Sequence, residues 1–251
     1  MTELIVLGTA ASVPDAEHDT VGYVLRGPDW AILIDCGGSP LHKLAQLGVG
    51  LEQIHAVVLT HRHADHLYGF PMLVQGLWIG GRASPLPVYG PAETLEVAQT
   101  LLELFTLVER PDMFRLEWHS VPLREGRPVL EMHGVRITAA PGNHAGIGVV
   151  ALRFEDTLTG RSIVYSADTE PCPAVSRLAT GADLLLHEAS GGQLGHSSPA
   201  QAAEVAREAG VGRLVLTHYP AHRVDLQAWL SEAAEFPGPT ALARDGDVYP
   251  L

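Results

Sequence analysis

The chain has 251 residues, of which 46% are hydrophobic and 18% are charged, so it can bury a large core and is not expected to be disordered. Its 16 basic and 29 acidic residues give a formal net charge of −13, which argues against a surface that holds long nucleic acids. No run of about 18 apolar residues predicts a membrane span. The N-terminus leads directly into a strand pattern and the two cysteines lie far apart, so we expect a cytoplasmic protein without a disulfide framework.

The predicted elements begin with three strands and continue as mixed strands and helices in both halves of the chain. Short apolar, β-branched runs predict strands at residues 4–7, 21–26, 31–35, 56–59, 86–89, 114–120, 128–130, 135–140, 147–154, 162–166, 184–186, 214–216, 240–243 and 247–249. Helices are predicted from residue 40 and over 70–79, 91–107, 173–179, 198–209 and 225–235. No linker is evident, so we expect one domain over residues 1–251. Its fold class is α/β, with two mixed sheets packed face to face and helices outside.

The segment from Thr60 to His66 holds three histidines and one aspartate directly after an apolar strand. His61 and His63 are two residues apart and point the same way in an extended turn, whereas the neighbours Asp65 and His66 diverge. This pattern predicts two half-sites, each for one metal ion. Imidazole and carboxylate together suit zinc, with manganese or iron as alternatives. The competing interpretation is a polar loop whose histidines are solvated or bind backbone groups.

Three later predicted strands also end in residues of the types that bind metals, namely His144, Asp168 and His218. Each alone is more often a turn, cap or hydrogen-bonded structural residue. Together with the cluster they supply the ligands of a dinuclear site. The expected first metal binds His61, His63 and His144, the second binds Asp65, His66 and His218, and Asp168 bridges them. We therefore expect two Zn²⁺ ions, or Mn²⁺ or Fe²⁺ in their place, which activate a bridging hydroxide.

The pattern His61-x-His63-x-Asp65-His66, with His144, Asp168 and His218, resembles the metallo-β-lactamase superfamily. Segments 165–172, 186–190, 195–198 and 216–219 resemble motifs of its ribonuclease Z and phosphodiesterase branch. The resemblance implies the αββα sandwich of the superfamily. It also implies that Asp65 orients or deprotonates the attacking water, and that Glu188 and His196 help to protonate the leaving group. A cap or salt bridge at Glu188, and a helix-cap neighbour at His196, are the structural alternatives.

Two features depart from the tRNA-processing members of that branch. Those enzymes usually carry an inserted arm that grips tRNA, but here only residues 145–167 separate His144 from Asp168. Segment 14–20 also lacks the usual Arg-Asn pair. We therefore predict a dinuclear-zinc phosphodiesterase acting on a small or cyclic-nucleotide phosphodiester, with tRNA as a disfavoured partner. A ribonuclease Z-type tRNA 3′-end endonuclease is the first alternative. A sulfatase- or lactonase-type hydrolase is the second alternative. The alternative outside the enzymes is a non-catalytic binding protein.

The resemblance also implies a homodimer, for which the apolar segment 70–79 with Trp78 is a candidate contact surface. Core packing explains that segment equally well. No membrane partner is expected. No catalytic or metal-binding role is implied for four other histidines, which are expected to be structural or at the surface: His55, His119, His187 and His222.

Overall fold

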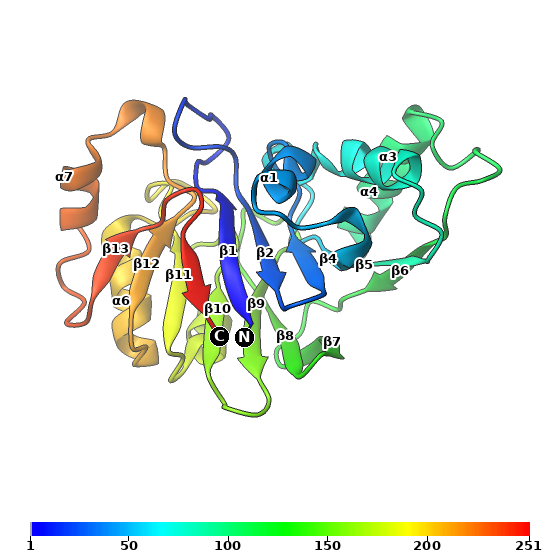
Figure 1. The fold of residues 1–251 in the computed structure, drawn as a ribbon. Coiled ribbons are helices and arrows are strands. Elements are labelled where there is room, and N and C mark those ends of the chain that lie inside the picture. The colour runs from blue at the N-terminus through cyan, green and yellow to red at the C-terminus, as the bar shows by residue number, and fades with distance from the viewer. Residues whose placement is uncertain (1) are drawn as a thin grey trace.

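Two seven-stranded sheets form the centre of the computed structural model, which describes residues 2–251 (Figure 1). The first sheet has the order β14-β1-β2-β3-β4-β5-β6, with bounds Val248–Pro250, Glu3–Gly8, Gly22–Arg26, Ala31–Ile34, Ile54–Val58, Leu86–Gly90 and Leu116–Ser120. The second has the order β13-β12-β11-β10-β9-β8-β7, with bounds Thr240–Leu242, Leu214–Thr217, Leu184–Glu188, Ser162–Tyr165, Val150–Asp156, Val135–Pro141 and Arg127–Met132. Each sheet combines parallel and antiparallel pairs, which confirms the predicted sandwich.

Helices cover the outer face of each sheet. Apolar contacts join the first sheet to α1 (Pro40–Gln46), α3 (Phe70–Ile79) and α4 (Ala92–Leu104). The second sheet is covered by α5 (Pro173–Ala179) and α6 (Pro199–Ala209), and α7 (Leu226–Ser231) lies beside β13. The remaining helices are α2 (Ala64–Leu67) and the 3₁₀ turns η1 (Leu51–Gln53) and η2 (Ala221–Arg223). Every helix within residues 2–251 is too short or too polar to span a bilayer.

The central strands are apolar on both faces because each face is covered. In β1, Leu4 and Val6 belong to the core between the sheets, whereas Ile5 and Leu7 pack toward the helices. Successive strand side chains point to opposite faces, so a strand with both faces covered needs apolar residues at every position. This explains why the sequence shows continuous apolar runs rather than alternation.

Most predicted boundaries lie within two residues of the observed ones, and the largest differences concern the ends of three elements. Helix α4 ends at Leu104 rather than 107, and α7 is shorter at both ends than 225–235. Strand β9 begins at Val150 rather than 147, because Ala145 and Gly146 adopt positive φ angles of 49° and 83° and form a turn. Helix α2 was not predicted, since four residues are too few to show a helical period.

The strand directions bring several carboxyl ends to one end of the sandwich. Strands β3, β4 and β5 are parallel, as are β10, β11 and β12, and β8 runs in the same direction as β10 because both are antiparallel to β9. The chain termini lie at the opposite end, where β1 begins and β14 finishes (Figure 1). The segments that follow β4, β8, β10 and β12 therefore begin at the same end of the sandwich, where their side chains can contact one another.

Candidate metal centre

The first group of candidate ligands joins the segment after β4 to the loop after β8. The Nδ1 atom of His63 lies 3.2 Å from Nε2 of His61 and 2.9 Å from Nε2 of His144. Oδ2 of Asp168, from the turn after β10, lies 3.8 Å from Nε2 of His61 and 3.9 Å from Nε2 of His144. These distances of 2.9–3.9 Å are shorter than twice a metal–ligand bond of about 2.0–2.2 Å, so one cation could contact all four residues.

The second group lies directly beside the first. Helix α2 carries Asp65 and His66, and His218 follows β12. Nε2 of His218 lies 3.3 Å from Oδ2 of Asp65 and 3.3 Å from Nε2 of His66. Asp168 reaches this group as well, with Oδ1 3.4 Å from His66 Nε2 and Oδ2 3.5 Å from His218 Nε2. The structure thus brings together all seven residues that the sequence proposed, with Asp168 between the two sets.

The chemistry of these groups fits two divalent cations. Oδ1 of Asp168 is buried, yet it accepts no hydrogen bond from any described residue. A buried carboxylate oxygen without a partner is costly, and a cation is the partner that the surrounding nitrogen and oxygen atoms also favour. The donor set of imidazoles and carboxylates can hold the expected zinc ions, and it does not distinguish zinc from manganese or iron.

In four of these histidines Nε2 faces the other ligands, and Nδ1 contacts a side chain or backbone group on the far side of the ring. His66 Nδ1 donates to Asp35 Oδ2 at 2.9 Å, and His61 Nδ1 lies 3.1 Å from Thr60 Oγ1, which itself donates to Asp35. His144 Nδ1 donates to the Gly195 carbonyl at 2.6 Å, and His218 Nδ1 lies 2.7 Å from Ser190 Oγ. Such partners would hold each ring with Nε2 available to a metal ion once that nitrogen has lost its proton.

The residues behind the centre were missed from the sequence. Asp35 directly follows β3, and its carboxylate also accepts the Thr60 N–H at 2.7 Å. Its φ is 58°, and Ala167 and His218 have φ angles of 50° and 49°, conformations that usually cost about 1–2 kcal/mol per non-glycine residue. Ser12 was missed as well, and its Oγ donates to Asp65 Oδ2 at 2.8 Å. The strand predicted over residues 31–35 was the local signal for Asp35, because it places a carboxylate at a strand end, where the predicted ligands also lie.

Charge and burial act in opposite directions on the titrating groups of the centre. Burial favours the neutral form of Asp168, but the imidazoles of His218 and His66 outweigh it and hold the pKa of this carboxyl well below its usual range. Burial and the neighbouring His66 hold the pKa of His61 well below its usual value, so this ring is neutral at pH 7. Burial opposes protonation of His66 and His218, but Asp168 and the other neighbouring carboxylates outweigh it and raise the pKa of both rings, so these two rings must lose a proton when a metal ion binds.

Glu188 and His196 form a pair at the edge of the second group. His196 Nδ1 donates to Glu188 Oε1 at 3.0 Å and lies 3.9 Å from Asp168 Oδ2. Glu188, at the end of β11, also accepts the backbone N–H groups of Thr169, Ser197 and Ser190. Burial lowers the pKa of His196, but the bond to Glu188 outweighs it and raises that pKa above its ordinary value. The geometry favours Glu188 as the residue that orients His196.

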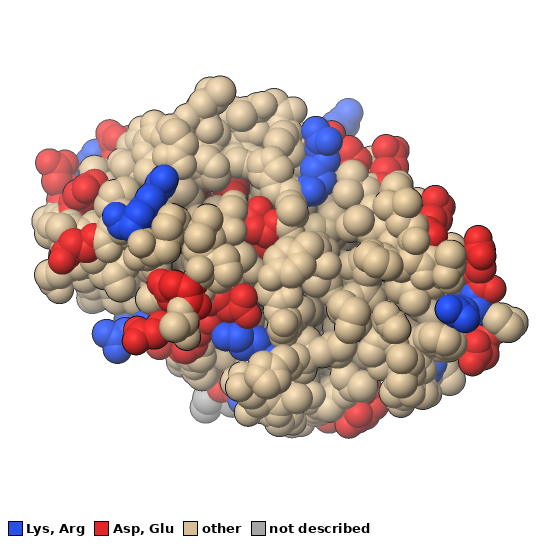
Figure 2. All heavy atoms as spheres, turned by 90° about the horizontal axis from the view of Figure 1, so that it is seen from above, with Lys and Arg blue, Asp and Glu red and all other residues tan. Residues whose placement is uncertain are grey.

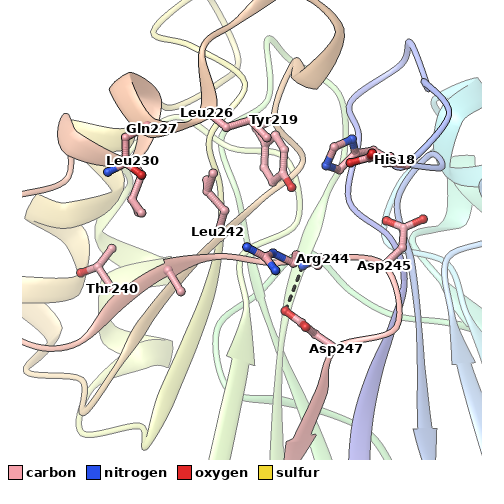
Figure 3. Close-up of a pocket in the computed structure, with 12 residues that line it drawn as sticks. His18, Tyr219, Leu226, Gln227, Leu230, Thr240, Leu242, Arg244, Asp245 and Asp247 are labelled. Atoms are coloured by element: carbon pink, nitrogen blue, oxygen red, sulfur yellow. Dashed lines mark hydrogen bonds between the residues drawn. The ribbon is translucent and has the colours of Figure 1, made fainter.

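On the face that Figure 2 shows, the described residues form no continuous basic patch. Figure 2 views the end of the sandwich opposite the chain termini, and its Lys and Arg side chains lie singly among more numerous carboxylates. A cavity of about 590 Å³ is lined by His196 with Gln193, Leu194 and Glu170. A second cavity, of about 800 Å³, lies between α7, β13 and the loop bearing His18, with the Tyr219 ring in its wall (Figure 3). None of the seven candidate ligands lines either cavity.

The four histidines without a motif lie outside both ligand groups. His187 is fully buried, and its Nδ1 donates to the Glu188 carbonyl at 2.8 Å. His119 stacks on Tyr89, with ring centroids 4.7 Å apart. His222 is exposed in η2. His55 contacts another histidine near the start of β4.

Comparisons with known proteins agree with this architecture. Residues 31–219 match a family model described as a beta-lactamase superfamily domain. The chain is 30% identical to a ribonuclease Z of Methanothermobacter thermautotrophicus over 87% of this chain and 86% of the relative. It is 32% identical to a ribonuclease Z of Mycobacterium marinum over 98% and 97%. Among solved structures, the metallo-beta-lactamase fold protein YhfI from Bacillus subtilis superposes with a TM-score of 0.83 at 28% identity, covering 99% of this chain and 98% of that one.

Proposed function

The chain belongs to the metallo-β-lactamase superfamily, in its ribonuclease Z-like branch, and from this premise we propose that it is a metal-dependent endonuclease that hydrolyses a phosphodiester bond near the 3′ end of precursor tRNA. Hydrolase chemistry follows from the family. The observation that supports phosphodiesters most directly is the pairing of His196 with Glu188 beside Asp168. The relatives named ribonuclease Z favour this activity over the small-substrate phosphodiesterase that the sequence alone had favoured.

Two divalent cations would bind the seven proposed ligands, and when bound they supply a water of lowered pKa and neutralise charge on the phosphate. Asp65 accepts a hydrogen bond from Ser12 and lies beside His218, and these contacts fix the direction of the carboxylate that would orient or deprotonate the attacking water. The Glu188 carboxylate occupies His196 Nδ1, which leaves Nε2 to hold the proton for the leaving oxygen. The raised pKa of His196 keeps a larger fraction of the ring protonated near pH 7.

The substrate is tested by incubating zinc- or manganese-loaded protein with precursor tRNA that carries a 3′ trailer. The same preparation is given bis-p-nitrophenyl phosphate and a panel of 2′,3′- and 3′,5′-cyclic nucleotides. We expect one endonucleolytic cut after the discriminator nucleotide, together with slower turnover of the small diester. His63→Ala should abolish both activities. If His63→Ala leaves both activities unchanged, the proposal that catalysis takes place at this metal centre is wrong.

A small or cyclic-nucleotide phosphodiester is the second candidate substrate, and one observation favours it. Between His144 and Asp168 the chain forms only a loop, β9, a tight turn and β10, with no inserted arm to grip the body of a tRNA. Bound RNA would also meet the scattered carboxylates seen in Figure 2. Turnover of a cyclic nucleotide without cleavage of precursor tRNA would establish this candidate in place of the first.

We also propose that residues 1–251 act as one domain and that the chain forms a homodimer through α3. This helix buries Phe70 and Leu77 in the core but exposes Met72 by 58% and Ile79 by 69%. Exposed apolar side chains on one helix are a common feature of dimer contacts. Light scattering of the native protein and of Ile79→Glu tests the idea, since the native protein should have twice the mass of the variant.

A further inference from the structure

Two histidines that have no part in the metal centre face each other at the opposite end of the sandwich. His55 lies near the start of β4 in the first sheet, and His133 lies in the turn between β7 and β8 of the second sheet. Nδ1 of His55 is 2.9 Å from Nε2 of His133. The contact therefore joins the two sheets far from the ligands that follow β4 and β8.

The nitrogen–nitrogen and centroid distances of this pair fall within the ranges found in the candidate metal centre, although its rings are inclined by 29°, less than the 38–78° of the pairs there. Those pairs have nitrogen–nitrogen distances of 2.9–3.3 Å and ring centroids 4.7–5.2 Å apart. The rings of His55 and His133 have centroids 5.0 Å apart. With metal–nitrogen bonds of about 2.0–2.1 Å, two nitrogens at a right angle lie about 2.9 Å apart, and two in a tetrahedron lie about 3.3 Å apart. The observed 2.9 Å corresponds to adjacent positions of a square-planar or octahedral ion.

The surroundings hold the rings in place and leave them accessible. Trp30 stacks on His133 with ring centroids 5.0 Å apart and an interplanar angle of 9°, and this contact limits the rotation of the ring. His133 is exposed and His55 is partly exposed, so a cation can reach them from solvent. Burial, His133 and Arg82 lower the pKa of His55, while Asp29 opposes them. Its neutral, metal-binding form therefore prevails at pH 7.

We propose that His55 and His133 form a separate surface site for one Cu²⁺ or Ni²⁺ ion, with water molecules in the remaining positions. These ions bind imidazole well and accept ligands at right angles. Because the ligands belong to different sheets, the bound ion links the start of β4 to the β7–β8 turn and stabilises the folded state by mass action. The site is independent of the proposed endonuclease activity.

The test is a calorimetric titration of the zinc-loaded protein with Ni²⁺, repeated for His55→Gln, His133→Asn and the control His222→Gln. Asparagine is chosen at residue 133 because it tolerates the positive φ of 52° found there. His222 is an exposed histidine in η2 and is not among the residues of either proposed site. Exchange of Ni²⁺ into the zinc centre is common to all four proteins and cancels in the comparison. Circular dichroism verifies that each variant is folded.

We expect the native protein and His222→Gln to bind one more equivalent of Ni²⁺ than either pair variant, or to bind it at least about tenfold more tightly. Ni²⁺ should also raise the thermal midpoint of those two proteins more than that of the pair variants. With one equivalent of Cu²⁺, electron paramagnetic resonance should show nitrogen hyperfine splitting that His55→Gln loses. Equal Ni²⁺ binding by all four proteins would overturn the proposal and leave the pair as a hydrogen bond only.

Discussion

Replacing Asp35 with asparagine turns one buried carboxylate oxygen behind the metal centre into an NH₂ group. This change should weaken metal binding by one of the two ligand groups. The Asp35 carboxylate accepts hydrogen bonds from Thr60 N, Thr60 Oγ1 and His66 Nδ1 at 2.7, 2.9 and 2.9 Å. The amide oxygen of asparagine can keep the bond to Thr60 N, but its NH₂ group then faces His66 Nδ1. The His66 ring must then carry its proton on Nε2, which is the nitrogen that would otherwise bind the metal ion. Asparagine tolerates the φ of 58° at this position, so the backbone is preserved.

Losing such a supporting bond usually lowers metal affinity by about 10- to 100-fold, which equals about 1.4–2.7 kcal/mol. We expect this loss for the ion held by Asp65, His66 and His218, and a smaller change for the other ion. Chelator competition with Zn²⁺ measures both affinities, with the exposed Asp29→Asn as the matched control. If Asp35→Asn binds two ions as tightly as the native protein does, Asp35 does not set the tautomer of His66 and the reasoning is wrong.

Three further predictions concern other parts of the structure. Glu93 Oε1 accepts the Gly148 N–H at 2.6 Å in the loop that bears His144 and lies 3.7 Å from Arg62 Nε, so Glu93→Ala should cost about 1 kcal/mol of stability and weaken binding at the first ligand group. Glu93→Gln, which keeps an acceptor, and the exposed Glu96→Gln should both behave nearly as the native protein does in the same zinc titration. His196→Ala should lower kcat by about 10²–10⁴-fold, since a general acid is removed. The native kcat should fall as pH rises through the raised pKa of His196, and an unchanged alkaline limb in the variant would exclude this role. Burial lowers the pKa of His187, so the unfolded chain binds more protons than the folded one below about pH 6.5, and stability is lost as pH falls. Urea unfolding at pH 5 and pH 7 should show a smaller difference for His187→Gln than for the native protein, and an equal difference would contradict the assignment.

Local sequence patterns predicted the elements that are long enough to show a helical or strand period. The helices at 70–79 and 173–179 have the predicted bounds, because apolar spacing and a proline at the start mark each one. The helix predicted to 107 ends at Leu104, and the helix over residues 64–67 escaped notice. The first case concerns a helix end, where the last turn frays, and the second concerns a helix that is too short to show a local period.

The sequence by itself determined which strands are buried on both faces and that four of them are followed by residues of metal-binding types. These are local properties, because each can be inferred from a short run of apolar residues and from the residue types that follow it. Only the tertiary structure decided that Asp35 supports His66, that the Gly195 carbonyl supports His144, and that Ser12 contacts Asp65. It likewise decided that His55 of one sheet meets His133 of the other. Each of these contacts joins residues more than thirty positions apart, and such pairs are set by strand order and sheet packing, which no local spacing records.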